Sequence, residues 1–194
     1  MKLAIVIFRN NLRIEDNHSL YKACEENEHI LGLYSFELLD GFIFSFKKCE
    51  IFREKFIKES LINLKENLLK YHINLCFTNS IEKSLQKLSK LYDITLYFDE
   101  EVGVEEKLFE KKLKIYKHKS YFSQTMIEPF SFDYKKSFSS FRNKAEKLSI
   151  LEPLKNIKKR ASIEFETIEI NIPQIKITNK NAILFKGGED EALK

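Results

Sequence analysis

The chain has 194 residues, of which 43% are hydrophobic and 32% charged, with only five glycines and three prolines. This composition excludes a disordered chain, and the length suits one core with an appendage better than two full domains. The net charge of +4 is spread along the sequence, so it neither requires nor excludes nucleic acid as a partner.

The cysteines and the hydropathy pattern indicate the cellular location of the protein. Cys24, Cys49 and Cys76 are an odd number at wide spacing, which fits neither a disulfide framework nor a pair of metal ligands. No apolar stretch approaches the roughly 18 residues that span a bilayer, and Met1 leads directly into a strand-like run. We therefore expect a soluble, cytoplasmic protein with no membrane partner.

The first third of the chain has the pattern of a strand, a helix and a second strand. Residues 3–8 (LAIVIF) are continuously apolar, as in a parallel strand that is covered on both faces. Asp16 or Asn17 can cap a helix that runs to about Asn27. Residues 30–36 (ILGLYSF) then predict the second strand.

The same alternation continues to about residue 116. Apolar positions three to five residues apart predict a long amphipathic helix over 49–71, which returns to a strand at 73–77. Ser80 is placed to cap the next helix, which precedes a strand at 94–98. A helix over 104–112 then leads to a short strand near 113–116.

Five strands separated by helices predict an α/β fold: a doubly wound, mostly parallel five-stranded sheet of the Rossmann-like kind with helices on both faces. Such sheets bind ligands at the carboxyl ends of their strands, so the loops after Phe8, Phe36 and Phe98 are where chemistry is expected. The glycine-rich phosphate loops GxGxxG and GxxxxGK[ST], the zinc motif HExxH and the GxSxG elbow are all absent from the sequence, and no catalytic residue or metal site is predicted.

Beyond residue 118 the alternation stops. An irregular stretch, a short helix at 137–148 and a polar tail with β-like pieces at 163–177 read as a connector, whose amides we expect to exchange faster than those of the sheet. The closing KGGEDEALK places two glycines before an acidic, helix-favouring start. The predicted organisation is thus an α/β domain over 1–118 and a connector over 119–185.

A specific resemblance begins directly after the first strand. Residues 8–17 (FRNNLRIEDN) resemble the signature FRxDLRxxDN of the DNA photolyase and cryptochrome family. The matching residues are Phe8, Arg9, Leu12, Arg13, Asp16 and Asn17. The family usually has Trp before the Phe and Asp before the Leu, and here those places hold Ile7 and Asn11. An alternative, purely structural interpretation of the two arginines is ion pairing with Glu15, Asp16 or the connector.

Four further segments resemble the family in its own order. Residues 52–68 are similar to a helix of DASH-type members, 100–107 (EEVGVEEK) to the loop after the fourth strand, and 137–148 to the DASH pattern FxxFRKKVE. Residues 185–193 (FKGGEDEAL) resemble the FxGGExxAL that opens the family's helical domain. The chain is therefore similar to the amino-terminal α/β domain of a photolyase, in particular of the DASH-type cryptochromes.

The resemblance implies a function that this domain does not perform alone. Photolyases split pyrimidine dimers by light-driven electron transfer from FAD, and both FAD and the lesion bind the helical domain, of which residues 186–194 would be the start. The connector would wrap toward that domain, on the same or a separate chain, and DNA would be bound only through the intact protein. The sequence has no Trp, so it lacks the tryptophans through which related proteins reduce their flavin.

The family's amino-terminal domain often holds an antenna chromophore, usually methenyltetrahydrofolate and sometimes a deazaflavin. A pterin presents an amide and amino edge, so the carboxylates of Glu101, Glu105 and Glu106 are the candidate acceptors. The alternative is an acidic helix start that is favoured by the helix dipole. We accordingly expect an antenna and scaffold domain. The competing hypothesis is a stand-alone nucleotide-binding or stress-type α/β protein.

Overall fold

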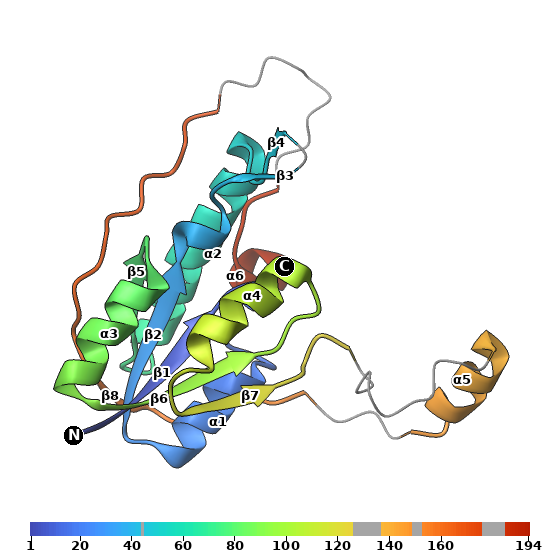
Figure 1. Ribbon diagram of the computed structural model, residues 1–194, viewed down its shortest axis with the longest axis horizontal. Helices are drawn as coiled ribbons and strands as arrows, with labels where there is room; N and C mark the ends of the chain where they lie inside the picture. The colour runs from blue at the N-terminus through green and yellow to red at the C-terminus, as the bar shows by residue number, and fades with distance from the viewer. Residues whose placement is uncertain (44, 126–136, 149–152, 176–184) are drawn as a thin grey trace.

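The computed structural model describes residues 1–43, 45–125, 137–148, 153–175 and 185–194. Its centre is a six-stranded parallel sheet, whose arrangement can be followed in Figure 1. The strands are β1 (Lys2–Phe8), β2 (His29–Ser35), β5 (Asn74–Thr78), β6 (Asp93–Asp99), β7 (His118–Tyr121) and β8 (Ala161–Ser162). The predicted α/β class and the mostly parallel sheet are confirmed, with β8 as an additional short strand.

Helices cover both faces of the sheet. They are α1 (His18–Glu26), α2 (Ile51–Leu69), α3 (Ile81–Leu91) and α4 (Val104–Leu113). Asn17 caps α1 by accepting a hydrogen bond from the Leu20 amide at 3.0 Å, and Ser80 caps α3 in the same way through the Lys83 amide. The N-cap side chains satisfy amides that have no partner within a helix.

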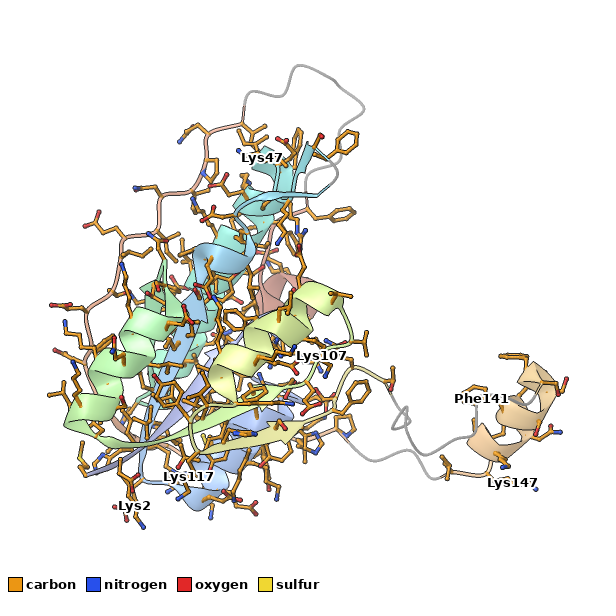
Figure 2. All side chains as sticks on the ribbon, viewed as in Figure 1. Lys2, Lys47, Lys107, Lys117, Phe141 and Lys147 are labelled. Atoms are coloured by element: carbon orange, nitrogen blue, oxygen red, sulfur yellow. The ribbon has the colours of Figure 1, made fainter. Side chains whose placement is uncertain are left out.

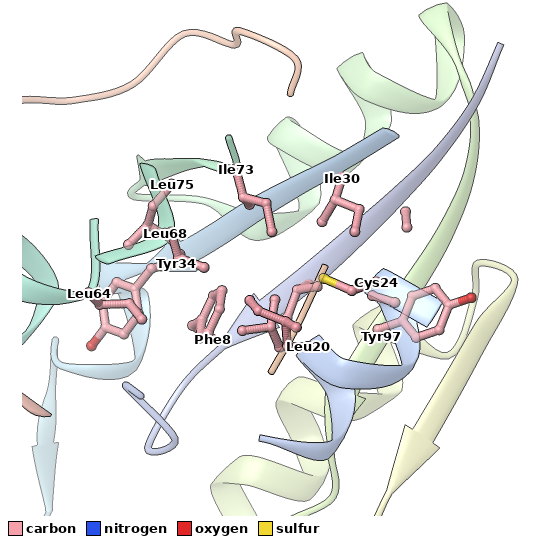
Figure 3. Close-up of a cluster of buried hydrophobic side chains, with 14 of the residues drawn as sticks. Phe8, Leu20, Cys24, Ile30, Tyr34, Leu64, Leu68, Ile73, Leu75 and Tyr97 are labelled. Atoms are coloured by element: carbon pink, nitrogen blue, oxygen red, sulfur yellow. The ribbon is translucent and has the colours of Figure 1, made fainter. Parts of the chain in front are cut away.

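The core has two halves because successive side chains of a strand point to opposite faces. On one face, shown in Figure 3, Phe8 packs with Leu20 of α1 and Leu64 of α2. On the other, Ile5 packs with residues of α3 and α4 such as Leu85. Residues 3–8 are all buried, as expected for a strand with no solvent-facing side.

The strands lie in the order β5-β2-β1-β6-β7. The chain starts in the middle at β1, moves outward through β2 and β5, and then returns to the other side of β1 at β6. The carboxyl ends of strands at such a reversal are the usual ligand position in open α/β sheets. The short strand predicted near residues 113–116 is wrong. These residues form the end of α4 and a turn, and β7 begins at His118.

Part of the segment expected to be a connector lies along the sheet. β8 pairs with the start of β2, and the following residues run past the edge strand β5, where the Phe77 amide donates to Thr167 Oγ1 at 2.8 Å. The Ile168 amide donates to the Phe77 carbonyl at 3.2 Å. These contacts cover an edge that would otherwise present unpaired backbone groups. Ile163 adds its side chain to the core.

The remaining elements are short. The 3-10 helix η1 (Phe36–Leu38) and a hairpin of β3 (Phe42–Ile43) and β4 (Phe46–Lys47) follow β2, and α6 (Glu189–Ala192) lies beside α2. The helix α5 (Phe138–Ala145) confirms the helix predicted at 137–148. Figure 2 shows α5, with Phe141, apart from the sheet and its covering helices. Within the described ranges, no helix combines the length and apolar character needed to cross a bilayer.

Candidate functional site at the carboxyl edge of the sheet

A cavity of about 610 Å³ opens where β1 and β2 end. The loop after β1, η1, one side of α2, the start of α4 and α6 all contribute to its wall. The residues that line the cavity include Arg9, Asn10, Arg13, Glu15, Tyr34, Arg53, Phe56, Ile57, Glu105, Glu106, Gly188, Glu189, Ala192 and Leu193. The predicted strand-end location is therefore a real cavity, large enough for a heteroaromatic ligand.

Arg9 forms the centre of a buried charge cluster beside this cavity. Its guanidinium lies 3.5 Å from Glu101 Oε1 and 3.2 Å from Glu110 Oε1, and its Nη2 also donates to the Asp99 carbonyl. The arginine side chain is 3% exposed. Arg9 thus pairs with residues after β6 and on α4, rather than with the Glu15, Asp16 or connector partners considered from the sequence.

One atom of this guanidinium has no partner. Arg9 Nη1 is fully buried and makes no hydrogen bond within the described part of the chain. A buried donor without an acceptor is unfavourable, and such groups are rare outside ligand sites and strained regions. Arg9 lines the cavity, but Nη1 itself has no accessible surface, so the charge cluster borders the candidate site without offering this donor to it.

The three glutamates proposed from the sequence occupy different environments. Glu101 is 5% exposed, and its carboxylate accepts a 2.8 Å hydrogen bond from Asn10 in addition to the Arg9 contact. Burial raises the pKa of Glu101, although Arg9 and Asn10 oppose that rise. Glu105 and Glu106 line the cavity, and Glu105 also forms a 2.5 Å ion pair with Lys48. Two of the three glutamates therefore line the cavity, while Glu101 is engaged within the charge cluster.

A second carboxylate network supports α4 and β7. Lys114 and Lys107 contact Glu100 at 2.9 and 3.2 Å, and Ser120 donates to it at 2.8 Å. Burial works to raise the pKa of Glu100, but these hydrogen bonds outweigh it and hold the pKa at about 2. The result is a carboxylate that stays charged at neutral pH and fixes the loop between β6 and the start of α4.

The signature loop is held largely by its own polar groups. Asn17 Nδ2 donates to the carbonyls of Asn11 and Arg13 at 3.2 and 2.9 Å, and Asn11 Nδ2 donates to Asp99 Oδ2 at 3.2 Å. Arg13 contacts Asp16, one of the partners considered for it from the sequence, at 3.4 Å. The family's usual Asp before the Leu is replaced by Asn11, whose uncharged amide donates this hydrogen bond to the Asp99 carboxylate.

Sequence reasoning missed several residues of the site. Tyr34 is 3% exposed, and burial raises the pKa of its hydroxyl. Because it lies at the end of an apolar strand, its sequence context is that of an ordinary core residue. Arg53 and Glu110 looked like surface charges on amphipathic helices. Only their position over the strand ends, which depends on the tertiary fold, identifies them.

Comparisons with known proteins agree with this architecture. A family model described as DNA photolyase matches residues 4–158. The chain is 29% identical to a cryptochrome DASH from Synechocystis, with 97% of this chain and 43% of that protein covered. The crystal structure of Synechocystis sp. PCC6803 cryptochrome superposes with a TM-score of 0.85 at 26% identity, over all of this chain and 45% of that chain.

A more distant structure shares the fold. An archaeal photolyase from Sulfolobus tokodaii, described with two FAD molecules and as implying a novel light-harvesting cofactor, gives a TM-score of 0.72 at 23% identity. It is covered over 45% of its length, and this chain over 100%. The chain spans less than half the length of the curated relatives it matches.

Proposed function

Because the chain belongs to the DNA photolyase family, we propose that its cavity at the strand ends holds a light-harvesting chromophore. In this proposal the α/β domain positions the chromophore and acts as a scaffold. A helical domain, on the same or a separate chain, would carry FAD and bind the DNA lesion. Repair of pyrimidine dimers or light sensing would belong to the combined protein, and we infer a cytoplasmic location for it.

The observation that carries the proposal is the cavity with mixed walls at the strand ends. Apolar surface comes from Phe56 and Ile57, which suits an aromatic ring system. Carboxylates come from Glu105 and Glu106. Ligand pockets typically combine mainly apolar walls with a few polar groups that fix orientation.

Methenyltetrahydrofolate is the first candidate. Its pterin edge carries hydrogen-bond donors, and Glu105 and Glu106 supply charged acceptors in the cavity wall. Glu101 would act through Arg9, by keeping that guanidinium in place. The alternative is that these acidic residues only stabilise the start of α4. Glu105 and Glu106 lie in its first turn, where the helix dipole favours negative charge.

FAD is the second candidate, because the Sulfolobus photolyase is described with two FAD molecules. Arg9, Arg13 and Arg53 offer donors around the same cavity, which would suit carbonyl and phosphate oxygens. The competing hypothesis of a stand-alone nucleotide-binding or stress-type protein is less well supported, because the sequence has no glycine-rich phosphate loop.

The test is a titration of the purified chain with each chromophore, followed by absorption and fluorescence. We expect one of the two to bind with a stoichiometry of one. Ala192→Trp, which adds bulk at the cavity wall, should weaken binding by about tenfold or more. Ala145→Trp on α5 adds the same bulk away from the cavity and should leave binding unchanged. Failure of both chromophores to bind would contradict the proposal.

A further inference from the structure

The two segments that most resemble the family meet in the fold. Ile14 and Glu15, in the loop after β1, donate their backbone amides to the two carboxylate oxygens of Glu189, each at 2.9 Å. One side chain of α6 thereby satisfies two consecutive main-chain donors that lie more than 170 residues away in sequence. Charge-assisted hydrogen bonds of this kind are stronger than those between neutral groups.

A second set of contacts fastens the same segment to α2. Asn63 and Asn67 donate to the two oxygens of Asp190 at 2.8 Å each, and these bonds lower the pKa of Asp190. The Gly187 amide donates to Glu59 Oε2 at 3.0 Å. All three side chains on α2 are polar and present hydrogen-bonding groups along one side of that helix.

The glycine pair makes this close approach sterically feasible. A Cβ at Gly187 would lie 2.1 Å from the Phe56 carbonyl oxygen, so no other residue could pass α2 at this distance. Gly188 has a φ of +125°, a conformation that side chains rarely adopt. The backbone of residues 187–188 is thus adapted to lie flat on α2.

This segment is also part of the cavity wall. Gly188, Glu189, Ala192 and Leu193 line the cavity, and Figure 1 shows α6 beside α2 near the sheet edge. The large apolar side chains of the segment are poorly covered: Phe185 is 75% exposed and Leu193 69%. Polar contacts, rather than apolar burial, therefore hold it in place.

We propose that residues 185–194 form a detachable wall of the cavity and that Glu189 is its latch, with the amides of Ile14 and Glu15 as the receiving site. A ligand in the cavity and the docked segment then stabilise each other, because each completes the surroundings of the other. This coupling rests on the proposed function. The latch itself depends only on the contacts described above.

The latch is tested by residue-resolved amide hydrogen exchange of the full chain. Glu189→Gln replaces one acceptor oxygen by an NH₂ group that faces a donor, so the amides of Ile14, Glu15 and Gly187 should exchange about tenfold faster. Glu191→Gln is the matched control: it makes the same charge change in the same helix, but the partners of Glu191 among the described residues are Lys186 and Lys194. Exchange in this control should stay within about twofold of the wild type.

Unchanged exchange in Glu189→Gln, or an equal increase in Glu191→Gln, would overturn the latch. The coupling is tested by titration with methenyltetrahydrofolate and FAD. Whichever binds the wild type should bind Glu189→Gln several-fold more weakly and slow the exchange of Gly187 further; equal affinity for both proteins would overturn the coupling. If neither chromophore binds the wild type, the proposed function and the coupling both fail, while the exchange comparison still decides the latch.

Discussion

Residues 1–121 and residues 153–194 are stabilised in different ways. The first region builds its own core, and in β1 every residue from Leu3 to Phe8 is buried. In the described parts of the second, single side chains such as Ile157 and Ile163 enter a core that other elements form, and hydrogen bonds to β5, α2 and the signature loop complete its attachment. The described parts of the second region are therefore held by the surface on which they lie, and the two regions should respond differently to substitution.

The largest effect is expected within the first region at Arg9. Arg9→Met leaves the buried carboxylates of Glu101 and Glu110 without their shared cation, which should lower the free energy of unfolding by about 3 to 5 kcal/mol. Arg13→Met removes an exposed pair and should change it by less than about 0.5 kcal/mol. Urea unfolding measures the free energy of unfolding of both variants. If Arg9→Met lowered it as little as Arg13→Met does, the cluster around Arg9 would not be a stabilising element.

The next effect compares the two regions directly. Leu64→Ala, in the core that α2 shares with the sheet, should cost about 3 kcal/mol, whereas Ile163→Ala should cost about 1 kcal/mol because its neighbours can adjust. The Ile168 amide should likewise exchange faster than that of Ile5. If Ile163→Ala cost as much as Leu64→Ala, the second region would be an integral part of the core.

A smaller effect concerns chromophore binding. In the chain reconstituted with the helical domain of the proposed function, Glu105→Gln or Glu106→Gln should weaken methenyltetrahydrofolate binding by about 1 to 3 kcal/mol at whichever carboxylate pairs with the pterin edge. Glu101→Gln tests the role through Arg9. If all three variants bind folate as the wild type does, the acidic run serves as a helix start and the site assignment is wrong.

The smallest effect is a dependence on pH. The pKa of Glu100 is about 2 in the folded protein against an ordinary value of 4.5. Its ionised form therefore stabilises the fold fully at a pH above 4.5. That contribution is lost as the pH falls toward 2. Glu100→Gln should flatten this part of the stability curve by less than about 1 kcal/mol, measured by urea unfolding at several pH values. A variant with the same acid dependence as the wild type would contradict the assignment.

The sequence predicts those helices and strands whose apolar residues recur at a regular spacing or form a continuous run. Residues 3–8 and the helix over 49–71 were found from local pattern alone. β7 was misplaced because its residues (HKSY) are polar and half-buried, whereas the apolar Leu113 belongs to the end of α4. β8 has no pattern of its own, since its pairing with β2 depends on the path of the chain before it. The division into domains at residues 118 and 185 stays a prediction.

The candidate site was predictable in location but only partly in composition. The strand-end rule identified the loop after Phe8, and the acidic run supplied Glu105 and Glu106. Glu101 differs from its neighbours because it points toward Arg9, and a contact between residues 92 positions apart is not encoded in local spacing. The position of Tyr34 in the site, and the contact of Glu189 with the amides of Ile14 and Glu15, are not encoded in local spacing for the same reason.

The receiving site for Glu189 is made of main chain, and this has a consequence for protein engineering. The amides of residues 14 and 15 are present whatever side chains they carry, so the contact survives any substitution at Glu15 other than proline. Glu15 nevertheless lines the cavity. Under the proposed function, its side chain can therefore be varied in a library to change which chromophore the cavity accepts, while the attachment of residues 185–194 is kept.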